Sequence, residues 1–134
     1  MSNLSGLPLR REACMALGYT SRPAYGRQDY EWWNSSEQIE ANFACHGIEN
    51  LPAIESDPAV AIPTATEFAR KHELEITVGV YLDGTSDCAF YKMRQGHAVK
   101  VALGEGDNPC EAIARAIVKA SEQRVIGADR EKES

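Results

Sequence analysis

Residues 74–103 run LEITVGVYLDGTSDCAFYKMRQGHAVKVAL, and polar and apolar side chains alternate along most of this stretch. A period of two is typical of β-strands that pack one face against a core. Asp83-Gly84 and Gln95-Gly96 interrupt the alternation, and such dipeptides favour tight turns between paired strands. The stretch therefore predicts a three-stranded antiparallel meander, with Val78 buried in the core.

A helix is predicted directly after the meander. Asn108 is a suitable helix cap, Pro109 is favoured at the first helical position, and Glu111 can bond back to the start of the helix. Its buried stripe is expected to consist of Cys110, Ile113, Ile117 and Ala120. From Arg124 onward the sequence turns polar, so the helix is expected to fray toward the end of the chain.

Helices are predicted on either side of the middle segment that precedes the meander. Apolar side chains between Leu9 and Leu17 recur at helical spacing, and Gly18 can end this helix in the left-handed conformation. Asp57 before Pro58 is the start of another helix. The interior Pro63 predicts either a short turn before the main helix or a kink within it.

Length and composition predict one globular α+β domain. The chain has 134 residues, of which 43% are hydrophobic and 25% charged, and a domain of this size buries roughly two thirds of its unfolded surface. We expect the domain over 7–125, a flexible leader over 1–6 and a flexible polar tail over 126–134. The net charge of -6 argues against duplex DNA as a partner, because phosphate binding needs a basic face.

The segment 19–34 is rich in aromatic residues but shows no period, so it is predicted to be an irregular loop. Its rings belong to Tyr19, Tyr25, Tyr30, Trp32 and Trp33. Adjacent side chains of an extended segment point to opposite sides, so one of Trp32 and Trp33 can enter the core while the other needs a cover. The cover is either a flap packed on the sheet or a subunit or partner contact. We expect a homo-oligomer with one of the two indoles in or near its interface. Ser35, with Gln38 three residues later, predicts a helix start after this loop.

The sequence offers no metal, redox or catalytic motif. The four cysteines, Cys14, Cys45, Cys88 and Cys110, are far apart and form no Cys-x-x-Cys pair. Phosphate loops and nucleophile motifs are missing as well. We therefore expect no metal, no cofactor and no enzyme activity. Arg10-Arg11 interrupts the first apolar residues and no run reaches membrane-spanning length, so we expect a cytoplasmic protein with reduced thiols and no membrane partner.

Four segments together resemble the phage ABA sandwich domain, a family of small bacteriophage and prophage proteins. They are Ala16-Leu17-Gly18-Tyr19 at a helix end, Trp32-Trp33, the segment from Leu51-Pro52 to Ser56-Asp57, and the Pro-x-x-Ala-Ile-x-Arg-Ala helix from Pro109. The resemblance extends over most of the chain, from residue 9 to 122, and departs from the family pattern at 45–56 and 59–63. It implies an α/β/α sandwich, with helices on both faces of the sheet, in the cytoplasm of a bacterial host.

The resemblance also implies a protein that works by binding. The first hypothesis is sequestration of a small nucleotide signal, by analogy of fold with the phage sponge that counters the Thoeris defence. Tyr91, Arg94, Arg115 and Lys119 are then expected to line one concavity that binds phosphate. As the alternative, the basic residues among them form only a solvated surface. The second hypothesis is a protein–protein inhibitor of a host defence complex, similar to an anti-CRISPR protein, that acts through an acidic surface.

Overall fold

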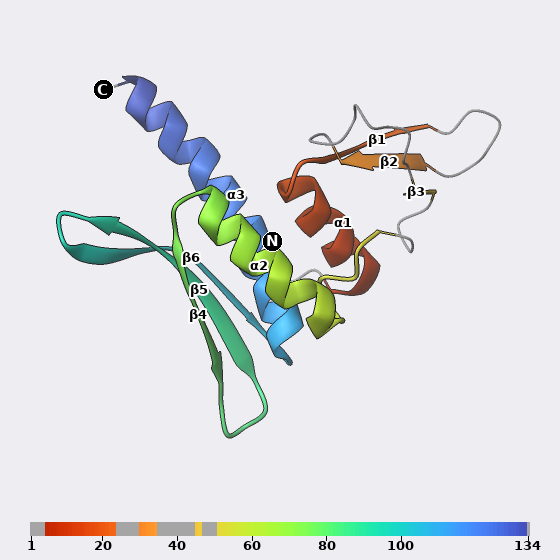
Figure 1. Cartoon of the computed structure of the whole chain (residues 1–134), viewed down its shortest axis with the longest axis horizontal. Coiled ribbons are helices and arrows are strands. Elements are labelled where there is room, and N and C mark those ends of the chain that lie inside the picture. Colours follow the sequence, from red (N-terminus) through yellow and green to blue (C-terminus); the bar gives the residue numbers. More distant parts are fainter. Residues whose placement is uncertain (1–4, 24–29, 35–44, 47–50, 134) are drawn as a thin grey trace.

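The computed structural model describes residues 5–23, 30–34, 45–46 and 51–133 (Figure 1). Its elements in chain order are α1 (Gly6–Ala16), β1 (Tyr19–Pro23), β2 (Tyr30–Asn34), β3 (Cys45–His46), α2 (Pro58–Lys71), β4 (Glu75–Val80), β5 (Ser86–Arg94), β6 (His97–Gly106) and α3 (Pro109–Glu133). The mixed α+β class, in which helices flank an antiparallel sheet, is confirmed. Within the described ranges, no helix is both long and apolar enough to cross a membrane.

The predicted meander is confirmed. β4, β5 and β6 form an antiparallel sheet in that order, and Val78 lies opposite Cys88, which lies opposite Gly104. Both predicted turns are present, and Gly84 and Gly96 have φ angles of 93° and 84° there. Glycine adopts such positive φ angles without the steric cost that a side chain would impose.

Two helices pack against the face of the sheet that carries Phe90 and Gly104. The Phe68 ring of α2 lies 5.3 Å from the Phe90 ring, measured between centroids. α3 lies so close to β6 that a Cβ atom on Gly104 would overlap the backbone of Ala112 and Ala116. α1 packs on α3, so the helices gather on one side of the β4–β6 sheet (Figure 1). Among the described residues, the helices therefore do not cover both faces of the sheet, as the expected α/β/α sandwich requires.

The hydrophobic core fills the space between these helices and the sheet. Its largest fully buried side chains are Leu9, Cys14, Ile54, Cys88, Phe90, Ile113 and Ile117. At its border, Arg10 of α1 forms an ion pair of 2.9 Å with Glu55 in the segment before α2. Burial alone would raise the pKa of Glu55, but the hydrogen bonds and charge of Arg10 help to bring this pKa below its usual value.

The predicted helix boundaries are confirmed at three places. Asp57 accepts a hydrogen bond of 3.0 Å from the Ala59 N–H, and Asn108 accepts one of 2.9 Å from the Glu111 N–H. Gly18 follows α1 with a φ of 108°. Pro63 lies inside α2, which continues from Pro58 to Lys71, so residues 58–62 belong to the main helix and form no separate turn before it.

The prediction of an irregular loop over 19–34 is wrong for Tyr19–Pro23 and Tyr30–Asn34, which form strands. β1 pairs antiparallel with β2, so that Tyr19 lies opposite Asn34, and β2 pairs with the short β3. Aromatic residues favour strands, but the polar sequence of β1 has no apolar alternation to reveal one. The predicted helix start at Ser35 and Gln38 lies outside the described residues. The same holds for the side chains of Trp32 and Trp33, although their backbone lies in β2.

The prediction that Val78 is buried is also wrong. Its exposed fraction is 45%, and that of Val80 on the same face is 69%. The hairpin of β4 and β5 extends beyond the ends of the helices, which leaves its far part uncovered (Figure 1). Alternation shows which side chains share a face of a strand, but it does not show how far a helix covers that face.

The end of the chain also differs from the expectation in its secondary structure. α3 runs to Glu133 and therefore includes nearly all of the segment 126–134, for which the sequence predicts a tail. The flexibility of this segment and of the leader stays a prediction.

Candidate functional site

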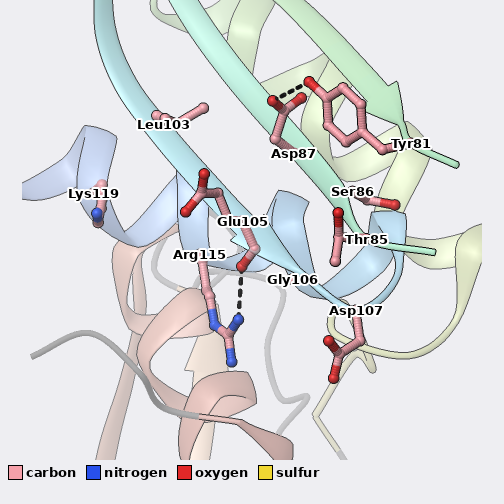
Figure 2. A pocket seen from close by; sticks show the side chains of 11 residues that line it. Tyr81, Thr85, Ser86, Asp87, Leu103, Glu105, Gly106, Asp107, Arg115 and Lys119 are labelled. Atoms are coloured by element: carbon pink, nitrogen blue, oxygen red, sulfur yellow. Dashed lines mark hydrogen bonds between the residues drawn. The ribbon is translucent and has the colours of Figure 1, made fainter. Parts of the chain in front are cut away.

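A pocket of about 430 Å³ lies where the turn between β4 and β5 approaches the end of β6 (Figure 2). It is lined chiefly by Tyr81, Asp87, Glu105, Asp107, Arg115 and Lys119. The first three come from the sheet and its turn, Asp107 follows β6, and the two basic residues come from α3. The pocket therefore spans one face of the sheet and the outer edge of β6.

Strand register brings the acidic side chains of the sheet together. Asp87 lies directly opposite Glu105 in the pairing of β5 with β6, so both side chains leave the same face of the sheet. The Tyr81 hydroxyl donates a hydrogen bond of 2.5 Å to Asp87 Oδ2. This bond is the main cause of the raised pKa of Tyr81, and the charges of Asp87 and Glu105 act in the same direction.

Gly79 makes room for this contact. A Cβ atom at Gly79 would lie 2.9 Å from Asp87 Oδ1 and 3.1 Å from the Tyr81 hydroxyl oxygen. A larger residue would therefore push the aromatic ring away from the carboxylate. The absence of a side chain at this position is what lets the Tyr81 ring cross back over β4 and form one wall of the pocket.

Arg115 is held by acceptors of its own protein. Its Nη1 atom donates a hydrogen bond of 2.6 Å to the Glu105 carbonyl oxygen (Figure 2). Its Nη2 atom lies 3.3 Å from Glu111 Oε2. Glu111 also accepts a hydrogen bond of 2.8 Å from the Asp107 N–H. The guanidinium thus ties α3 to the end of β6, and its charge is compensated by Glu111.

The charge balance of the pocket is negative. Asp87, Glu105 and Asp107 contribute three negative charges. The positive charges are those of Arg115, which is already paired with Glu111, and of the exposed Lys119. An anion such as phosphate would be repelled by these carboxylates. It would also lack a set of hydrogen-bond donors that converge on it. A cation would meet carboxylates and the face of an aromatic ring, both of which attract positive charge.

The four predicted ligand residues do not line one concavity. Arg115 and Lys119 line the pocket. Tyr91 leaves the same face of the sheet as Asp87, but it lies farther along β5 and is not part of the pocket lining. Arg94 lies opposite His97 at the hairpin between β5 and β6, at the other end of the sheet. The expectation of a shared phosphate site fails because Tyr91 and Arg94 lie on β5 outside the pocket that Arg115 and Lys119 line.

Sequence reasoning missed Tyr81, Asp87 and Glu105. For Asp87 and Glu105, a register shift in the pairing of β5 with β6 between Phe90 and Tyr91 hides their proximity from the sequence. Counting back from the turn at Gln95-Gly96 without this shift would pair Asp87 with Gly104, and Glu105 would then leave the other face. A β-bulge changes which residues share a face, and no residue type marks its position here.

A second cleft, of about 710 Å³, lies between the end of α1 and α2. Leu17, Ile54 and Phe68 provide its apolar wall, and His72 packs edge-on against the Phe68 ring at a centroid distance of 4.6 Å. Its charged residues, Glu67 and Lys71, have opposite signs. The cleft thus combines an apolar floor with a rim that carries charges of both signs. This combination selects no particular class of ligand.

The buried cysteines have the properties of core residues. Cys14, Cys88 and Cys110 are free and buried. Burial raises the pKa of Cys88 to about 12 and that of Cys110 above its usual value, so both thiols stay protonated near neutral pH. The side chain of Cys45 lies outside the described residues. Across the part of the chain that the structure describes, no three histidine, cysteine or acidic side chains are grouped to hold a metal ion.

Comparison with models of protein families, with curated proteins and with solved structures finds no match to this chain. The resemblance to the phage ABA sandwich domain therefore stays a prediction, and the function rests on the geometry of the site.

Proposed function

We propose that this protein works by binding rather than by catalysis, and that its pocket receives a basic side chain of a protein partner. The observation that carries the proposal is the charge balance of the pocket: Asp87, Glu105 and Asp107 face a cavity in which Arg115 is already bonded. A lysine or arginine of a partner would supply the positive charge that these carboxylates attract.

The chemistry of the pocket favours a guanidinium or ammonium group over other ligands. Hydrogen bonds between an ionised donor and a carboxylate are stronger than neutral ones, and a planar guanidinium can bond two carboxylate oxygens at once. The Tyr81 ring adds a surface on which a cation can stack. Its hydroxyl is bonded to Asp87, which fixes the orientation of both groups before a partner arrives.

The geometry gives less support to a nucleotide signal as the ligand. That hypothesis needs Tyr91 and Arg94 beside Arg115 and Lys119, and the four side chains lie on different parts of the sheet and helix. We therefore favour the inhibitor hypothesis. In this proposal a phage or prophage protein occupies a basic site on a host defence protein in the bacterial cytoplasm.

Photo-crosslinking in the natural host tests the proposal. A benzoylphenylalanine in place of Lys119, at the exposed rim of the pocket, should form a discrete adduct with one protein. Adding Glu105→Gln or Asp87→Asn should reduce the adduct roughly tenfold to hundredfold, because a hydrogen bond to a charged group contributes about 1.5–3 kcal/mol. Glu122→Gln, an equivalent change on the exposed surface of α3, is the control and should leave the adduct unchanged.

Two results would argue against the proposal. One is an adduct that Glu105→Gln and Asp87→Asn leave unchanged, which would mean that the partner does not use the pocket carboxylates. The other is a nucleotide retained by the purified protein, detected by native mass spectrometry and lost in Arg115→Ala.

A further inference from the structure

β4 is an edge strand without the usual protection against pairing. The strand order is β4-β5-β6, and Glu75 at the start of β4 is its only charged residue. Val78 and Val80 are exposed on the same face, and the fully exposed Leu82 follows them in the turn. Edge strands of natural proteins usually carry lysine, proline or a bulge that prevents pairing with another chain.

The outer edge of β4 offers backbone groups at alternate residues. The Tyr81 N–H donates a hydrogen bond of 2.9 Å to the Thr85 carbonyl, so Tyr81 directs its backbone groups toward β5. In an antiparallel pair these groups alternate in direction along the strand. Ile76, Val78 and Val80 therefore direct their N–H and C=O groups away from β5, on the outer side of β4.

We infer that this edge pairs with β4 of a second copy of the chain, antiparallel, around a two-fold axis at Val78. In this register Val78 lies opposite the partner subunit's Val78, and Ile76 lies opposite the partner subunit's Val80. Each of these pairs can exchange both backbone hydrogen bonds, because all the residues in them direct their backbone groups outward. Their side chains share one face, so the exposed row of one copy packs against that of the other.

Self-complementarity favours a second copy as the occupant of this edge. In the two-fold register the apolar row of Ile76, Val78 and Val80 meets the same row of the partner subunit in reverse order. The charges at the ends of the row are of both signs. Lys92 and Arg94, near the start of β4, attract the partner subunit's Asp83, whereas Glu73 and Glu75 at the same end repel it.

The inference goes beyond the proposed function and does not depend on it. Most of the lining of the acidic pocket lies on β6 and α3, away from the paired edge, whereas its Tyr81 wall adjoins that edge. One strand from each copy makes a small interface, below about 1,200 Å², a size found in weak and transient complexes. We therefore expect a dimer that dissociates on dilution.

Sedimentation velocity of the full chain over a range of concentrations tests the dimer. The mass should rise from 14.7 kDa toward twice that value as the concentration increases. Val78→Lys places two like charges at the two-fold axis and should give a monomer at every concentration. Val99→Lys is the matched control, because Val99 is exposed to a similar fraction, 42% against 45%, on β6, away from the β4 edge.

A cysteine at the two-fold axis tests the register. Val78→Cys, in a Cys45→Ser background, should form a disulfide-linked dimer under mild oxidation, because directly paired residues lie within disulfide range. Val99→Cys in the same background should stay monomeric on a non-reducing gel. A chain that is monomeric at the highest concentration would overturn the inference. So would a dimer that persists in Val78→Lys, since the copies would then associate through another surface.

Discussion

At the scale of single residues, Arg10 and Glu55 join the first helix to the segment that precedes α2. Their side chains are 13% and 8% exposed and lie in direct contact. Removing one partner leaves the other charge poorly solvated, and this costs more than the pair itself contributes. We expect Arg10→Ala to lower the free energy of unfolding by about 1–3 kcal/mol in urea denaturation, whereas Arg11→Ala, at an exposed position on the same helix, should lower it by less than about 0.5 kcal/mol.

The lowered pKa of Glu55 predicts a pH dependence of stability. Its folded-state pKa lies below the ordinary value of 4.5, so the unfolded chain binds the proton more tightly than the folded one. The contribution of Glu55 is therefore fully present above pH 4.5 and is lost as the pH falls through the lower, folded pKa. Thermal melts of the wild type and of Glu55→Gln should accordingly converge as the pH is lowered. Curves that stay parallel down to the lowest pH would contradict the role of this pair.

Gly104 is the residue at which the sheet and α3 approach most closely. A methyl group there would overlap the backbone of α3, and a backbone cannot move aside as a flexible side chain can. Gly104→Ala should therefore cost about 1–3 kcal/mol or more, as overpacking of a core does. Chemical denaturation measures this cost. Ala98→Gly, at an exposed position of the same strand, is the control. It measures how much a glycine–alanine exchange changes the free energy of unfolding in β6 where no helix backbone is close.

At the scale of elements, α3 depends on its first turn for both stability and the shape of the pocket. Asn108 caps the helix, and Glu111 links the cap region to Arg115. We expect Asn108→Ala to lower the free energy of unfolding by about 0.5–2 kcal/mol, the usual cost of losing a helix cap. Ser121→Ala, within the same helix, should change it by less than about 0.5 kcal/mol. Equal losses in the two variants would argue against the cap.

A second comparison at this scale sets β4 against its neighbour β5. Phe90 of β5 is fully buried, whereas Val78 of β4 is half exposed. Phe90→Ala should cost about 3–5 kcal/mol, as is usual for a buried aromatic ring. Val78→Ala should cost less than about 1 kcal/mol in the monomer, since the side chain is half exposed. Urea denaturation at low protein concentration separates the two. A loss above 2 kcal/mol for Val78→Ala would mean that the helices cover more of β4.

The elements also show what could be predicted from the sequence. Turns, caps and the meander were predictable because Asp83-Gly84, Gln95-Gly96 and Asn108-Pro109 act through local backbone chemistry. The pairing of β1 with β2 was not, since its strands lack an alternating pattern. The candidate site was only half predicted: Arg115 and Lys119 lie on one helix face by simple periodicity. Asp87 and Glu105 meet only because of a register shift, which local sequence does not specify.

At the scale of the whole molecule, the sheet has two edges, which we assign different tasks. β6 and α3 form most of the acidic pocket, and β4, in which Glu75 is the one charged residue, offers an edge for a second copy. A dimer of this kind would carry a pocket on each outer side of its continuous sheet. A partner with two basic sites at matching separation would then bind more tightly than one with a single site, because the second contact becomes intramolecular.

The central claim is that the pocket attracts cations and not phosphate. Amide chemical shifts of ¹⁵N-labelled protein, titrated separately with N-acetyl-arginine amide and with pyrophosphate, test it without knowledge of the partner. We predict that the arginine compound shifts the amides of Asp87, Glu105 and Asp107 in a saturable way, that Glu105→Gln weakens this effect, and that pyrophosphate leaves these amides unchanged. Saturable shifts at Arg115 and Lys119 with pyrophosphate, and none in the pocket with the arginine compound, would contradict the account.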